Sequence, residues 1–357
     1  MFSYRKPPWW IGTSEDHGQA NIVNEYPQSF AEARVLAGLD WEPEVAEVFA
    51  ESMSDDEIKS AIADVLLAGE IKTTEQIDRL LAIVKAAYAP IKGWQNVRND
   101  TTRETIALTH DTYAVINHTA FGDILEALLD CDRDKLKLET GGSLAGGSKV
   151  WMLVMLDEPI ILPGDKSEAM PFVALTARHD ALGSVVARAT AVRIVCANTF
   201  SAAEMEGERT GATFTFRHTG NWRERIDDAK AAIKGVRSEI AAYVELSNRL
   251  LGVTITPVQQ ERFITEFIPS PPDTLISDRV ASNIERSRNA VREILASDTC
   301  EGAGINGTAY SLVQAAGEYL DHVRKANSWE TRLNRTLIRP ESLKARATSL
   351  ALAVAKD

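Results

Sequence analysis

The sequence predicts an α+β fold: an antiparallel β-sheet core with packed helices, an N-terminal helical insertion and a helical C-terminal half. Three observations predict it. Short apolar segments follow one another at hairpin spacing between residues 104 and 218, with few helices between them, which favours antiparallel pairing. Helical periodicity precedes them over residues 30–89. It returns after Thr219 and persists toward the C-terminus.

The segment before the sheet begins with residues 1–30, whose Pro, Trp, Asn and Gly content is typical of an arm or loop. Ser54 and Glu57 then form a capping-box pattern that starts a helix. Thr73 or Thr74 can cap a second helix. Apolar residues recur at helical spacing in both helices, so each is expected to bury one face. These positions are Ile58, Ile62, Val65 and Leu66 in the first helix and Ile77, Leu80, Leu81 and Val84 in the second.

The predicted sheet region contains one helix, at residues 120–129, and a series of short strands. The strands are expected at residues 104–108, 113–117, 136–140, 149–156, 172–176, 185–195 and 213–218. The sequence GGSLAGG at residues 141–147 supplies glycines for a hairpin connection between two of them.

The C-terminal half is predicted to be helical. Its helices are expected at about residues 221–250, from Pro257 to the Pro-rich break at 268–273, and at 276–296, 309–325 and 341–355, with a Gly-rich linker at 301–307. The length of 357 residues suits about two domains. We divide the chain into a Trp-rich arm and acidic helical segment (1–90), a sheet core with a long helix (91–250) and a helical region (251–357).

The composition is that of an ordinary globular protein, with 45% hydrophobic and 25% charged residues. No apolar run is long enough for a transmembrane helix, and the N-terminus lacks the pattern of a secretion signal. The three cysteines lie far apart and do not suggest a disulfide framework. We therefore expect a cytoplasmic protein with no membrane partner.

Motifs of common enzymes and cofactor sites are absent from the sequence. There is no paired Cys or His spacing for zinc, no GxSxG elbow, and GGSLAGG lacks the Lys-Ser/Thr end of a P-loop. We expect no cofactor and no metal, and a binding protein in preference to an enzyme. The alternative is a metal-dependent enzyme with Mg²⁺ on Asp157, Glu158 and Asp180, although their spacing does not single them out.

Several motifs, taken in order along the chain, resemble those of a known family. They are PWWIG (8–12), AGLDW (37–41), YAVINHTAF (113–121), GGSLAGGSKVW (141–151), ARHD (177–180), VRIVCANTF (192–200), FRHTGNW (216–222) and NGTAYSL (306–312). The chain thereby resembles the phage/plasmid-like protein family, a domain of unknown function found in phages, prophages and plasmids. Trp10 and Asn117-His118 depart from the family's usual residues. The resemblance implies a mobile-element origin and a bacterial host cytoplasm, and the core is similar to phage single-strand annealing proteins.

Charge is distributed unevenly along the chain. Overall, 39 basic and 51 acidic side chains give a net charge of −12, which disfavours non-specific nucleic-acid binding. However, residues 31–90 hold 5 basic and 13 acidic side chains, whereas residues 321–357 hold 8 basic and 4 acidic. The acidity is therefore mostly local to the N-terminal helices, and a phosphate-binding surface elsewhere is compatible with the sequence.

Basic and aromatic residues on or beside neighbouring strands form the candidate site. Arginine binds phosphates through a planar fork, and an exposed Trp can stack on a base. The candidate nucleic-acid-binding residues are Lys149, Trp151, Arg178, Arg188, Arg193, Arg217, His218 and Arg223. The alternative is ordinary structural pairing, because Arg188 and Arg193 differ in strand parity and would point to opposite faces. One of them can then pair with Asp180 or Asp157, and His218 can be a core histidine.

Three functions stay open at this point, and the third is the metal-dependent enzyme described above. The first is a phage- or plasmid-encoded nucleic-acid-binding protein, for example one that binds or anneals single-stranded DNA in recombination or replication as a homo-oligomer. The second is a non-enzymatic interaction protein that binds a host or phage protein through its acidic helices and Trp-rich arm.

Overall fold

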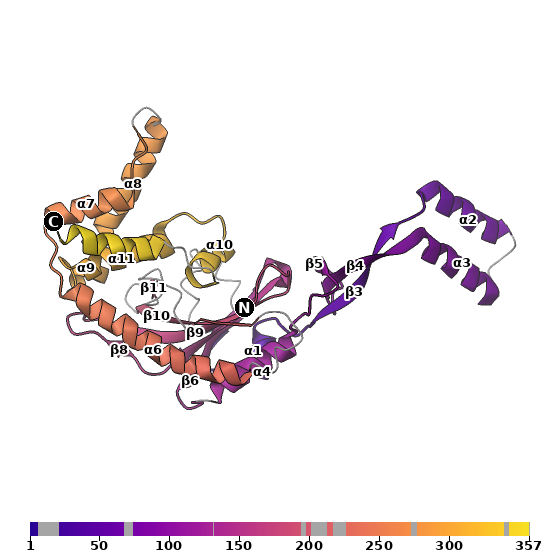
Figure 1. Ribbon diagram of the computed structural model, residues 1–357, viewed down its shortest axis with the longest axis horizontal. Helices are drawn as coiled ribbons and strands as arrows, with labels where there is room; N and C mark the ends of the chain where they lie inside the picture. Colours follow the sequence, from indigo (N-terminus) through magenta and orange to yellow (C-terminus); the bar gives the residue numbers. More distant parts are fainter. Residues whose placement is uncertain are drawn as a thin grey trace.

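The computed structural model describes residues 1–5, 21–67, 74–130, 132–193, 198–200, 213–216, 226–272, 277–338 and 343–356. Figure 1 shows a body, in which helices pack around a large sheet, and a narrow arm that projects from it. The predicted α+β class with a mainly antiparallel sheet is confirmed. None of the helices in these ranges combines the length and apolarity that crossing a bilayer requires.

The large sheet has the strand order β11-β10-β9-β7-β6-β1-β2, with β12 also paired to β10 and β8 to β9. Its strands are β1 (Phe2–Tyr4), β2 (Asn21–Val23), β6 (Leu136–Leu144), β7 (Lys149–Leu156), β8 (Ile160–Ile161), β9 (Glu168–Arg178), β10 (Val185–Arg193), β11 (Asn198–Phe200) and β12 (Thr213–Phe216). All their pairings are antiparallel except that of β1 with β2. The predicted β6–β7 and β9–β10 hairpins are confirmed, whereas the pairing of the N-terminus with β6 was not predicted.

The two faces of the sheet pack against different parts of the chain. Strand β7 is buried on both, since Val150 and Met152 face one side while Trp151 and Leu153 face the other. The helices of the first face are α1 (Phe30–Leu36), α4 (His118–Leu129) and α6 (Ile226–Leu251). The second face is covered by Leu333 of the short helix α10 (Trp329–Leu333). The C-terminal chain therefore crosses the side of the sheet that carries Trp151.

The C-terminal helices form a second hydrophobic core with the end of α6. They are α7 (Pro257–Phe267), α8 (Asp278–Leu295), α9 (Ala309–Glu318) and α11 (Leu343–Val354), with π-helical turns at Asp298–Gly302, Tyr319–Val323 and Asn334–Ile338. A buried ion pair links two of these elements: Lys344 Nζ lies 2.9 Å from Asp321 Oδ2, and the side chains are 3% and 2% exposed. The predicted helical character of this half is confirmed.

The arm is a β-ribbon that ends in a helical hairpin (Figure 1). Its elements are β3 (Pro43–Glu51), α2 (Asp55–Leu67), α3 (Thr74–Ala87), β4 (Tyr88–Asn99) and β5 (Thr105–His110). The predicted capping box is confirmed, because Ser54 N–H donates to Glu57 Oε2 at 2.7 Å and Glu57 N–H donates to Ser54 Oγ at 3.4 Å. The Ser54 hydrogen bonds also hold the pKa of Glu57 below its usual value.

Two expectations for this region are wrong. Residues 43–51 lie in a strand instead of a helix, paired with β4 from Pro43 opposite Asn99 to Glu51 opposite Tyr88. The expected strand at 113–117 is absent, and β5 takes β4 as its partner. The β3–β4 pairing joins strands that are separated by two helices, so it is not local in sequence, whereas β5 forms a hairpin with β4, the strand directly before it.

The apolar face predicted for the second helix is only partly buried. Ile77, Leu81 and Val84 are 50%, 50% and 53% exposed, whereas Val65 of the facing helix is 3% exposed. The prediction that these three residues are buried is wrong because the arm projects away from the body (Figure 1). Helix α3 therefore carries an apolar surface that no described part of the chain covers.

Candidate functional site

Three of the candidate basic residues point to the same side of the large sheet. Lys149, at the start of β7, lies directly opposite Arg178, at the end of β9. Arg188 of β10 lies opposite Ala174, which belongs to the same side as Trp151 and Leu153. The pairing of β9 with β10 is regular from Val186 to Arg193, with no bulge.

Arg178 does not offer its charge to a ligand, because Asp180 already binds it. Its Nε lies 2.8 Å from Oδ1 and its terminal nitrogen 2.5 Å from Oδ2, and both side chains are nearly buried. Burial raises the pKa of Asp180, but the hydrogen bonds from Arg178 and from Leu182 N–H outweigh it and hold the pKa below its usual value. Gly183 packs on this arginine, since a Cβ there would lie 2.4 Å from Arg178 Cδ. The structural pairing with Asp180 thus belongs to Arg178 and not to Arg188.

Trp151 is fully buried, at 0% exposure, in the core between the sheet and Leu333. It cannot stack on a base in this conformation, so the expectation that it contacts nucleic acid is not met by its position. Instead, its large side chain packs in the same hydrophobic cluster as Leu333 and so helps to hold α10 against the sheet. Arg217, His218 and Arg223 lie outside the described residues, as does the side chain of Arg193.

The structure also brings a basic segment next to the candidate residues, which the strand pattern did not predict. Residues 324–335 carry four basic side chains and one acidic side chain, and they lie beside Lys149. Lys149 Nζ donates to Asn334 Oδ1 at 3.3 Å. The basic side chains are Arg324, Lys325, Arg332 and Arg335, all of them partly or fully exposed. Together with Lys149 they form what we call the basic surface.

One atom of the basic surface has an unfilled hydrogen-bonding capacity. The Nε of Arg332 is buried and has no hydrogen-bond partner among the residues that the structure describes. Because this atom has no solvent exposure, it is not itself open to a ligand.

A second cluster is formed by buried aromatic and histidine side chains near the base of the arm. The ring centroids of Trp41 and His118 are 4.4 Å apart, and those of His118 and His179 are 5.2 Å apart. Gly147 approaches Trp41 so closely that a Cβ would lie 2.6 Å from the indole ring. His179 N–H donates to the Ser148 carbonyl at 2.9 Å. Four motifs that are separate in the sequence therefore meet in one place: AGLDW, Asn117-His118, GGSLAGG and Arg-His-Asp.

The carboxylate of Glu42 joins this cluster to helix α4. It accepts the backbone N–H of His118 at 2.6 Å and the hydroxyl of Thr119 at 2.7 Å. Arg34 lies 2.9 Å from the same carboxylate. An acidic group at a helix N-terminus stabilises the helix through its free N–H groups and its dipole. The geometry is thus that of a structural support, with both histidines closed off from solvent.

His118 gives this cluster a predicted pH dependence. Burial lowers the pKa of His118, and its Nδ1 hydrogen bonds to the Trp41 carbonyl at 2.7 Å oppose that effect only in part. Below the unfolded-state pKa of about 6.5, the unfolded chain binds a proton that the folded His118 does not, so stability falls as the pH falls. We expect wild type to lose up to about 1.4 kcal/mol per pH unit more than His118→Asn between pH 6.5 and 5.

Urea unfolding at pH 8, 6.5 and 5 measures this difference. Thr119→Ala is the matched control, because it removes one contact to Glu42 without removing a titrating group. Parallel pH profiles for wild type and His118→Asn would contradict the prediction.

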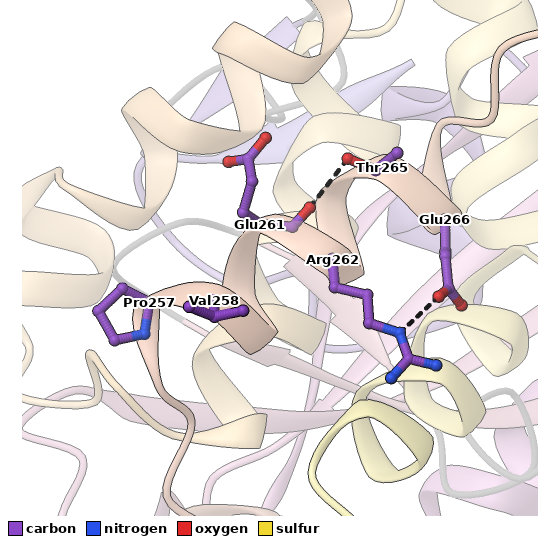
Figure 2. A pocket seen from close by; sticks show the side chains of 6 residues that line it. All are labelled: Pro257, Val258, Glu261, Arg262, Thr265 and Glu266. Carbon is purple, nitrogen blue, oxygen red and sulfur yellow. Dashed lines mark hydrogen bonds and ion pairs between the residues drawn. The ribbon is translucent and has the colours of Figure 1, made fainter. Parts of the chain in front are cut away.

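The hollow drawn in Figure 2 offers no comparable site. It lies along one face of α7 and is lined by Pro257, Val258, Glu261, Arg262, Thr265 and Glu266. Its charged groups already have partners, since Arg262 binds Glu266 at 2.7 Å and Glu261 binds Arg292. Across the described ranges, no group of three or more His, Cys, Asp or Glu side chains is arranged to hold a metal ion.

Comparison with known families identifies the chain. The family model described as Domain of unknown function (DUF932) matches residues 105–350, more than half of the chain. The chain belongs to the DUF932 family. The DUF932 region begins at β5 and ends within α11, so it includes β6–β10, Lys149 and the segment 324–335. The part of the arm from β3 through α3 to the end of β4 lies before it.

Searches of curated proteins and of solved structures each found no match. The role of the residues outside the DUF932 region therefore rests on the contacts that these residues make. The contact between Lys149 and residues 324–335 was not predicted from the sequence. The positive charge of residues 321–357 was the signal that could have suggested it.

Proposed function

We propose that this DUF932 protein binds single-stranded nucleic acid through the basic surface around Lys149. The observation that carries the proposal is the packing of the basic segment 324–335 against the sheet face beside Lys149. It supports a backbone-binding surface because several cations lie along one element with a single acidic residue, Glu330, among them. A phage or plasmid origin, a host cytoplasm and a role in annealing or protecting single strands are part of this proposal.

Fluorescence anisotropy with a labelled oligothymidylate across a NaCl series tests the proposal. We expect the dissociation constant to rise steeply with salt, because each phosphate contact releases counterions. Lys149→Gln and Lys325→Gln should each weaken binding and lower the salt slope by about one. Lys59→Gln on α2 is the control, since Lys59 is exposed and far from this surface. Binding without a salt slope, or equal binding by all variants, would overturn the proposal.

A second candidate function is non-enzymatic docking onto a protein, and the exposed residues of α3 favour it. Apolar side chains that stay half exposed on a projecting element are typical of protein interaction sites. This function predicts that arm variants lose a protein contact and leave oligothymidylate binding unchanged.

A further inference from the structure

The apolar surface of the arm continues from α3 onto the ribbon. Ile77, Leu81, Val84 and Tyr88 recur at a spacing of four, three and four residues, which places them on one side of the helix and its exit. Phe49 lies opposite Pro90, and Glu51 opposite Tyr88, so Phe49 and Tyr88 share one face of the ribbon. Phe49 and Tyr88 are 50% and 46% exposed. We call these five residues the arm stripe.

One acidic and one basic residue border the arm stripe, and the acidic residue comes first along the helix. Asp78 and Lys85 both border the stripe on the side away from α2, about 10 Å apart along the axis. Neither side chain forms an ion pair with another residue of the described chain. The stripe is thus flanked by one negative and one positive charge, placed on either side of Leu81.

This order fits a second copy of the same chain. We infer that the arm stripe pairs with the arm stripe of a second copy, the two α3 helices running antiparallel about a two-fold axis at Leu81. Such an axis brings Asp78 beside the partner's Lys85, and Lys85 beside the partner's Asp78, on the same flank of the pair. A parallel arrangement would instead place the partner's Asp78 and Lys85 on the opposite flank of the pair, where neither charge meets an opposite one. The charge order therefore selects the antiparallel dimer.

The inference deepens the second candidate function, because it names the partner of the arm. The stripe consists of five residues, whereas a standard interface has roughly 20–30 residues on each side. We therefore expect a reversible dimer that dissociates in the micromolar range and weakens with salt. Self-association through identical surfaces closes at two copies, so the arm alone does not build a filament.

Sedimentation velocity of the full chain over a concentration series tests the inference. Wild type should shift from monomer to dimer with rising concentration. Leu81→Glu should weaken dimerisation at least about tenfold, because it places two like charges at the axis. Asp78→Lys and Lys85→Asp should each weaken it about five- to tenfold, since each reversal acts at two symmetric positions. The double variant Asp78→Lys/Lys85→Asp should restore dimerisation, as the exchanged charges face each other again.

The control is Arg79→Asp, which reverses an exposed charge on the far side of the same helix. Circular dichroism should show the same helix content in all variants. A wild-type protein that stays monomeric at high concentration would overturn the inference, as would a double variant that is as weak as the single ones. If the double variant is as weak as the single ones and the arm variants also lose contact with another protein, the arm binds that protein and not a second copy. Fluorescence anisotropy of Leu81→Glu with oligothymidylate tests nucleic-acid binding separately. Failure of the dimer leaves this binding unchanged, whereas failure of the proposed function abolishes it in wild type as well.

Discussion

Replacing Lys344 with Met is expected to lower the free energy of unfolding by about 3–5 kcal/mol. Lys344 and Asp321 form a 2.9 Å ion pair with almost no solvent contact, so the substitution leaves a buried carboxylate without its cation. The cost of keeping the Asp321 carboxylate buried after its Lys344 partner is removed, more than the lost attraction, accounts for the size of the effect. Urea unfolding at pH 7 measures it.

The double variant Lys344→Met/Asp321→Leu should recover most of this loss, because it removes both charges from the core. Lys356→Met, near the end of the chain and exposed, is the control and should change stability by no more than about 0.5 kcal/mol. The explanation fails if the double variant is less stable than Lys344→Met.

Gly147→Ala is expected to destabilise the fold by about 2–5 kcal/mol, whereas Gly146→Ala should cost only about 1 kcal/mol. Both glycines have a positive φ, +89° at Gly147 and +63° at Gly146, so both substitutions add backbone strain. Only at Gly147 would the new Cβ also collide with a side chain, at 2.6 Å from the Trp41 ring; at Gly146 nothing lies within 4 Å. Equal melting temperatures for the two variants would show that Trp41 yields without cost.

The sequence predicted the parts of the fold whose signals are local. The β6–β7 and β9–β10 hairpins follow from alternating apolar segments around turn residues, and the capping box at Ser54 fixed a helix start. The β3–β4 ribbon was missed because its strands pair across two intervening helices. Helical spacing near Ile77 was recognised correctly, but spacing alone cannot tell whether the apolar side meets a neighbour.

The residue types of the candidate site were predictable from the sequence, but the role of each residue was not. Arginine and lysine on adjacent strands do share one face, as the register of Lys149 with Arg178 shows. Which arginine is neutralised depends on the turn after β9, where Asp180 folds back onto Arg178. Burial of Trp151 depends on residues almost two hundred positions later, which no local pattern reveals.

The length of the arm sets a distance between two copies of the protein. Nine residues of β3 span about 30 Å, and Leu81 lies about 10 Å farther along α3. Two copies joined at Leu81 would hold their sheets about 80 Å apart on a stiff connection. A nucleic-acid strand bound by one basic surface would then meet the second at a raised effective concentration if it spans that gap, and shorter strands would not. An arm of this length would then act as a spacer that selects ligands by length.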